Sequence, residues 1–137
     1  MNKLGVTTLI LRVMLGISFF VHGVVKFQGG IVNIVGWFES LGLPGFLAYV
    51  VGIVEVVGGI ALVLGIGTRI VSVVLGLLMI GAILKVKLAI GFLGTAEMAG
   101  YELDLAFLVI AIFLAVNGSK LLAVDEAILN KTANDKS

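Results

Sequence analysis

The sequence predicts an all-α membrane protein, a bundle of four transmembrane helices with one short amphipathic helix at the membrane surface. Hydrophobic residues make up 61% of its 137 residues and charged residues only 12%, and the mean hydropathy is +1.27. In soluble domains roughly a quarter of the residues are charged. A chain this short has too little interior to hide so much apolar surface from water, so we expect its apolar segments to lie in lipid.

Four apolar segments are long enough to cross a bilayer, which takes about 20 residues of helix. They cover about residues 4–27, 46–67, 69–92 and 103–124. Valine and isoleucine are frequent in them, but an open sheet cannot satisfy its backbone in lipid, so we expect helices. Residues 1–124 then form one membrane domain, and residues 125–137 form a polar tail that we expect to fray.

The connection between the first two spans predicts a short helix lying in the membrane interface. Its apolar residues recur at helical spacing on one side: Ile31, Ile34, Val35, Phe38 and Leu41. Trp37 lies on another side, where its indole suits the level of the lipid headgroups. Pro44 follows in "GLPG" and indicates a break before the second span.

The basic residues give a preferred orientation. With the N-terminus inside, five lysines and arginines fall on the cytoplasmic side and three on the outer side. We therefore predict that both termini are cytoplasmic. Small residues spaced four apart, Ala48 with Gly52 and Ala61 with Gly65, indicate close helix packing, either within one bundle or between two copies of the chain.

Ionisable residues inside the first two spans are the main functional signal, because charges in lipid are costly and face the bundle interior. At 100° per residue, Arg12, His22 and Lys26 fall within about 80° of one another on the first helix. Glu55 lies in the middle of the second span. Arg12 lies about 12 Å from the inner end and Glu55 about 14 Å from the outer end of a core of about 30 Å, so we predict an Arg12–Glu55 ion pair.

A second group of polar residues is expected at the outer mouth of the bundle. His22 and Lys26 end the first span there, and the predicted spans three and four bring residues Lys85, Tyr101 and Glu102 to the same level. We assign proton transfer to His22, Lys26 and Glu102, since histidine titrates near neutral pH and carboxylates relay protons. We assign ligand binding to the remaining candidates, Arg12, Glu55, Lys85, Trp37 and Tyr101.

Two further charges at this mouth have simpler explanations. Lys87 can extend its ammonium group to the headgroups, and Asp104 can stabilise the start of its helix through the helix dipole.

The composition also excludes several classes of function. The chain has no cysteine, which excludes disulfides, thiolate catalysis and cysteine-held iron–sulfur clusters. One histidine and scattered carboxylates match no metal-ligand spacing, so we predict no metal site. No basic run indicates nucleic acid binding. We expect no intrinsic cofactor, because no haem or flavin motif is evident.

Three blocks of sequence resemble the DoxX family of small four-helix membrane proteins. They are "LRVMLGISFFVHGVVKF", "GIVEVVGGIALVLGIGTR" and "GYELDLAFLVIAIFLAVNG", and the resemblance extends over about residues 9–118. It implies a bacterial inner-membrane protein of oxidoreductase type, similar to the quinone-facing subunits of the family. Some Gram-positive relatives look linked to catechol and quinone stress, which implies a soluble redox or dioxygenase-type partner.

Our leading hypothesis is therefore a membrane redox subunit that binds a quinone or catechol-type ring at the outer mouth, with electrons from a partner or substrate. Two alternatives remain open. One is a transporter or channel for a weak acid or aromatic, with Arg12 and Glu55 lining the path and two copies assembled. The other is a scaffold that tethers a soluble partner enzyme, with the polar residues serving structure alone.

Overall fold

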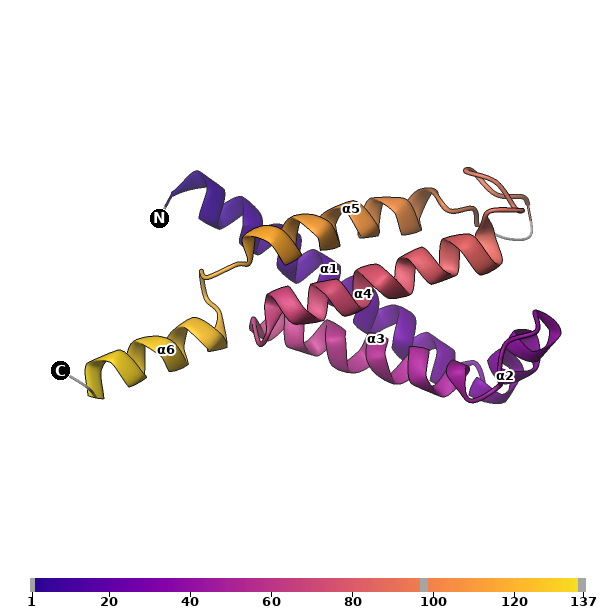
Figure 1. Ribbon diagram of the computed structural model, residues 1–137, viewed down its shortest axis with the longest axis horizontal. Coiled ribbons are helices and arrows are strands. Elements are labelled where there is room, and N and C mark those ends of the chain that lie inside the picture. The colour runs from indigo at the N-terminus through magenta and orange to yellow at the C-terminus, as the bar shows by residue number, and fades with distance from the viewer. Residues whose placement is uncertain (1, 97–98, 136–137) are drawn as a thin grey trace.

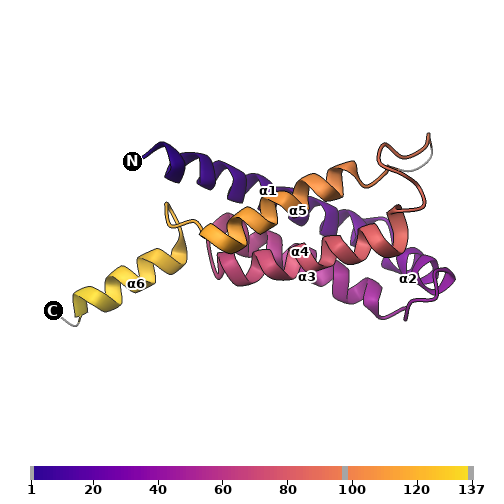
Figure 2. The same cartoon turned by 45° about the horizontal axis from the view of Figure 1, so that its top comes forward.

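The computed structural model describes residues 2–96 and 99–135, and within them it contains helices and no β-strand (Figure 1). This confirms the predicted fold class. The elements are α1 (Lys3–Gln28), α2 (Ile31–Ser40), α3 (Leu47–Leu64), α4 (Thr68–Ala82), the π-helical η1 (Ile83–Lys87), α5 (Glu102–Asn117) and α6 (Val124–Asp135). The two described chain ends lie at one end of the bundle, and α2 lies at the other (Figures 1 and 2).

Among the described residues, three helices are long and apolar enough to cross a membrane: α1, α3 and the continuous helix Thr68–Lys87 formed by α4 and η1. The predicted fourth span is shorter than expected. Helix α5 has 16 residues and ends at Asn117 rather than near residue 124. Gly118 ends it with a φ of 68°, a backbone conformation that glycine adopts easily. Residues 118–123 then form a loop instead of the last turns of a helix.

Helices α1 and α3 pack closely through glycines. A Cβ atom added to Gly16 would lie 2.7 Å from the carbonyl oxygen of Gly59, and one added to Gly59 would lie 2.5 Å from that of Gly16. A Cβ atom on Gly23 would lie 3.0 Å from the carbonyl oxygen of Gly52. Small residues allow such an approach of two helix backbones in lipid. Gly52 and Gly59 of the second span therefore serve packing within one bundle, which is one of the two roles predicted for the small residues.

These contacts also set the register of the two antiparallel helices. With residue 16 facing residue 59 and residue 23 facing residue 52, the end of α3 at Leu64 lies opposite about residue 11. Residues 3–10 of α1 therefore extend past α3 by about 12 Å. Helix α3 has 18 residues and is about 27 Å long, close to the thickness of a hydrocarbon core. A hydrocarbon core matched to the length of α3 would leave the extension of α1 at headgroup level.

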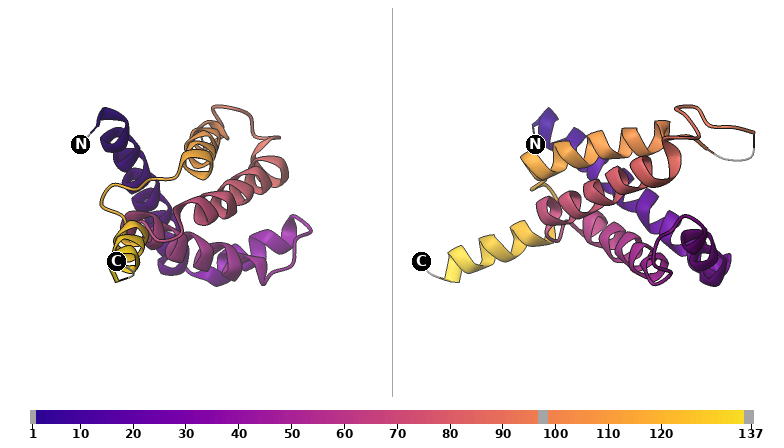
Figure 3. Two further views of the ribbon diagram at one scale, coloured as in Figure 1. Left: turned by 60° about the vertical axis from the view of Figure 1, so that its left-hand side comes forward. Right: turned by 45° about the vertical axis from the view of Figure 1, so that its right-hand side comes forward.

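Helices α4 and α5 form the other half of the bundle and lie side by side (Figure 3). The apolar core joins both halves. Its buried members are Leu15, Phe19, Leu62, Leu75, Met79, Phe107, Ala111 and Leu114. Phe19 of α1 contacts Phe107 of α5, with ring centroids 5.6 Å apart. The outward side chains of the spanning helices are largely apolar and exposed, as expected of surfaces that face lipid.

The structure contains the short helix predicted between the first two spans. It does not show the fraying predicted for the tail after residue 124. Helix α2 buries Phe38 and packs against α3 and α1, while Val32 on its other side is 71% exposed. Residues 136 and 137 of the predicted tail lie outside the described residues, and residues 125–135 instead belong to α6, which extends away from the bundle (Figure 2). Its start is fixed because the carboxylate of Asp125 accepts a hydrogen bond from the backbone N–H of Gly67 at 2.6 Å.

Candidate functional site

A buried ion pair joins α1 and α3, the two helices that pack against each other through glycines. The ammonium nitrogen of Lys26 on α1 lies 2.9 Å and 2.7 Å from the two carboxylate oxygens of Glu55 on α3. The Lys26 side chain is 24% exposed and the Glu55 side chain 5%. A charged carboxylate at this depth needs such a partner, because desolvation of an unpaired charge is costly.

A second ion pair lies between the other two helices. The ammonium nitrogen of Lys87 on η1 is 3.0 Å from a carboxylate oxygen of Asp104 on α5, and the two side chains are 22% and 13% exposed. Lys87 reaches α5 from a π-helical turn, in which Leu88 donates its N–H to the carbonyl of Ile83 five residues earlier. Such turns change the direction of the following side chains and are frequent at functional sites.

The two ion pairs and His22 form what we call the outer charge cluster: His22, Lys26, Glu55, Lys87 and Asp104. Both His22 and Asp104 lie close enough to Glu55 to interact with it electrostatically. The pairs balance two positive against two negative charges. His22 is exposed on its spanning helix, and its ring lies edge-on to Phe107 with centroids 6.1 Å apart. The cluster therefore combines buried, balanced charges with one accessible imidazole.

Several predicted site residues lie outside this cluster. Lys85 and Glu102 are exposed, and in the described part of the chain neither side chain makes a hydrogen bond or an ion pair. The Tyr101 ring packs on Phe92 at 5.4 Å, and Trp37 lies beside Phe38 at 6.0 Å. The structure thus brings together His22, Lys26 and Glu55 but joins none of the other outer candidates to them.

The predicted Arg12–Glu55 ion pair is wrong. Arg12 is 1% exposed, and its guanidinium donates instead to the loop after α5. Its acceptors are the Ser119 carbonyl at 3.4 Å, the Ser119 hydroxyl at 3.2 Å, and the carbonyls of Leu121 and Leu122, both at 3.0 Å. The helix register explains this difference, because Arg12 faces about residue 63 and lies about 12 Å along the helix axis from Glu55.

The Lys87–Asp104 pair was not predicted, although the sequence carries a signal for it. The two residues flank the connection between two antiparallel neighbouring helices, so opposite charges at those positions come to the same level. We expected Lys87 to extend to the headgroups and Asp104 to stabilise the start of its helix, so we predicted no contact between them. Among the described residues, no group of three or more His, Cys, Asp and Glu side chains could hold a metal ion.

The outer charge cluster can hold and exchange protons without a net charge in the membrane. Lysine and histidine supply hydrogen-bond donors, and the carboxylates accept protons from them. His22 is exposed on the surface of α1, so its imidazole is open to a molecule outside the bundle.

Comparison with known proteins gives one family and three bacterial relatives. A family model described as DoxX matches residues 7–88. The chain is 44% identical to the "Putative oxidoreductase CatD" of Bacillus subtilis (strain 168) over 98% of this chain and 96% of that protein. It is 36% identical to an uncharacterized membrane protein of Mycobacterium tuberculosis over 79% of this chain and 72% of that protein.

An uncharacterized protein of Haemophilus influenzae is 30% identical over 88% of this chain and 90% of that protein. No solved structure matches the chain.

Proposed function

The chain belongs to the DoxX family, and from this premise we propose that it is a membrane oxidoreductase subunit that binds a quinone or catechol-type ring at the outer charge cluster. The oxidoreductase name of the Bacillus subtilis relative supports the reaction class. The bacterial relatives, the long apolar helices and the distribution of basic residues support a bacterial inner membrane with both termini in the cytoplasm.

The observation that carries the proposal is the buried Lys26–Glu55 pair beside an exposed His22. Reduction of a quinone to a quinol takes two electrons and two protons. In this proposal a reduced redox partner or a second substrate supplies the electrons, and the chain supplies positions for the ring and the protons. His22 transfers one proton to a ring oxygen and is reprotonated from the Lys26–Glu55 pair, which regains its proton from water; water at the outer mouth supplies the second proton to the other ring oxygen.

The Lys87–Asp104 pair is assigned a supporting role. Asp104 carries a negative charge near Glu55, and Lys87 neutralises it at 3.0 Å. Without Lys87, the charge of Asp104 would act on Glu55 unneutralised, and a medium of low dielectric constant strengthens such repulsion. This pair therefore keeps Glu55 free to bind Lys26.

Binding of a short-chain quinone to the purified protein in mild detergent tests the proposal. We expect binding, seen as quenching of the single Trp37 and as quinone recovered by extraction and mass spectrometry. His22→Ala should abolish the binding, because it removes the exposed donor and leaves both ion pairs intact. Lys85→Met is the control, since it removes an exposed lysine outside the cluster.

Equal binding by the wild type and by His22→Ala would contradict the assigned site. If no ring compound binds at all, the oxidoreductase proposal fails. Flux of a weak aromatic acid into liposomes would then favour a transporter, and a stoichiometric soluble partner in mild detergent would favour a scaffold.

A further inference from the structure

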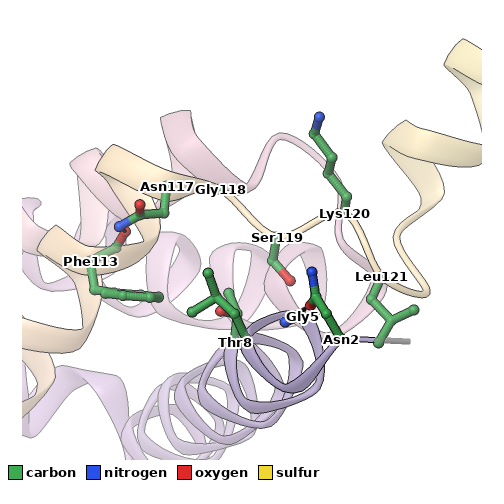
Figure 4. A pocket seen from close by; sticks show the side chains of 10 residues that line it. Asn2, Gly5, Thr8, Phe113, Asn117, Gly118, Ser119, Lys120 and Leu121 are labelled. Atoms are coloured by element: carbon green, nitrogen blue, oxygen red, sulfur yellow. Dashed lines mark hydrogen bonds between the residues drawn. The ribbon is translucent and has the colours of Figure 1, made fainter.

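A pocket with polar and apolar lining residues lies at the opposite end of the bundle from the outer charge cluster. It has a volume of about 500 Å³ and lies between the extension of α1 and the loop after α5. Its lining includes the polar residues Asn2, Thr8, Asn117, Ser119 and Lys120. Figure 4 shows the Ser119 hydroxyl turned toward Asn2, with Lys120 extending outward from the loop. None of the proposed redox chemistry uses this pocket.

The charges around the pocket are positive. Among the described residues that line it, Lys120 is the one charged residue and none carries a carboxylate. A neighbouring groove on the same loop differs, because Asp125 and Glu126 offset Arg69 and Lys120 there. Behind the loop, the buried guanidinium of Arg12 binds a hydroxyl and three carbonyl oxygens. These acceptors are neutral, so the charge of Arg12 adds to that of Lys120.

The loop also offers backbone donors. The carbonyls of Ser119, Leu121 and Leu122 are turned to Arg12. In the described part of the chain, the amide groups of residues 119–122 donate to no acceptor. The lining offers the Ser119 hydroxyl and the Lys120 ammonium group, and groups of this kind, together with backbone amides, bind phosphate groups in proteins.

The height of the pocket identifies the source of the phosphate. Its lining residues on α1 belong to the stretch that extends past α3 by about 12 Å. Since α3 spans about one hydrocarbon thickness, this stretch lies among the lipid headgroups. Basic pockets between helices at this level bind the headgroups of anionic lipids. We propose that the pocket formed by Asn2, Thr8, Ser119 and Lys120 binds the phosphate of an anionic phospholipid.

Native mass spectrometry of the full chain in detergent tests this proposal, with phosphatidylglycerol and phosphatidylcholine as probes. We expect phosphatidylglycerol to bind more tightly, and Lys120→Ala to weaken its binding about fivefold, the factor for one basic residue near an anionic surface. Lys131→Ala is the matched control. It removes the same charge from α6, outside the pocket lining, and should leave the affinity within about twofold.

Amide hydrogen exchange, measured with and without each lipid, shows which residues the bound lipid protects. Phosphatidylglycerol should slow the exchange of residues 117–122, and phosphatidylcholine should not. Equal weakening by Lys120→Ala and Lys131→Ala, or equal affinity for the two lipids, would overturn the site. Displacement of phosphatidylglycerol by millimolar inorganic phosphate would overturn the lipid assignment and leave a site for free phosphate.

Discussion

Replacing Lys26 with methionine should destabilise the protein more than the loss of one surface charge would. The substitution keeps most of the side-chain stem and removes the ammonium group that lies 2.9 Å and 2.7 Å from the Glu55 oxygens. Among the described residues, Lys26 makes the hydrogen bonds to Glu55, whose side chain is only 5% exposed. Removing one partner of such a buried pair costs about 3–5 kcal/mol of unfolding free energy.

A double-mutant cycle measures the pair itself. Reversible unfolding in mixed detergent micelles would be followed for Lys26→Met, Glu55→Gln and the double variant. We expect the double variant to recover most of the loss, because replacing both charges leaves no unpaired carboxylate, and the coupling energy should be about 2–3 kcal/mol. A second cycle, Arg12→Met with Glu55→Gln, should be additive within about 0.5 kcal/mol, since the two residues share no partner.

The same measurement can refute the reasoning. A loss below about 1 kcal/mol for Lys26→Met would mean that the pair behaves like an exposed one. A coupling energy larger for Arg12 than for Lys26 would refute the register set by the glycine contacts, and with it the composition of the outer charge cluster.

Three further predictions concern neighbouring features. Lys87→Met should cost about 1–3 kcal/mol in the same unfolding assay, because it strands Asp104, whereas Lys85→Met should stay within about 0.5 kcal/mol; equal effects would contradict the second pair. Gly59→Ala should cost at least about 1–3 kcal/mol from overpacking, because its Cβ would lie 2.5 Å from a backbone oxygen of α1. Gly81→Ala, with nothing within 4 Å, should be neutral or stabilising by up to about 1 kcal/mol. Asp125→Asn should speed hydrogen exchange at Gly67, whose N–H it accepts at 2.6 Å, and unchanged exchange would show that α6 is held otherwise.

Local pattern was sufficient to predict the long apolar helices and α2, but not α6, whose residues were expected to fray. A run of apolar residues of the right length predicts a spanning helix because lipid leaves the backbone no other way to satisfy its hydrogen bonds. The helical spacing of Ile31, Ile34, Val35 and Phe38 predicted α2, because a helix at the membrane surface needs one apolar face. The end of α5 could not be predicted in the same way. The apolar residues after Gly118 continue the pattern of a spanning helix, but in the structure they form a loop whose carbonyls accept hydrogen bonds from Arg12.

The sequence by itself determined that the protein is helical, that it lies in a membrane, and that Arg12, Lys26 and Glu55 lie within it. Only the tertiary structure decided which of these charges meet. Heights counted from the ends of predicted spans assume that the helices start and stop together. Contacts between Gly16 and Gly59 instead fix a register in which α1 extends past α3, which moves Arg12 to the loop and leaves Lys26 with Glu55. That register depends on backbone packing between segments far apart in sequence, and no local pattern carries it.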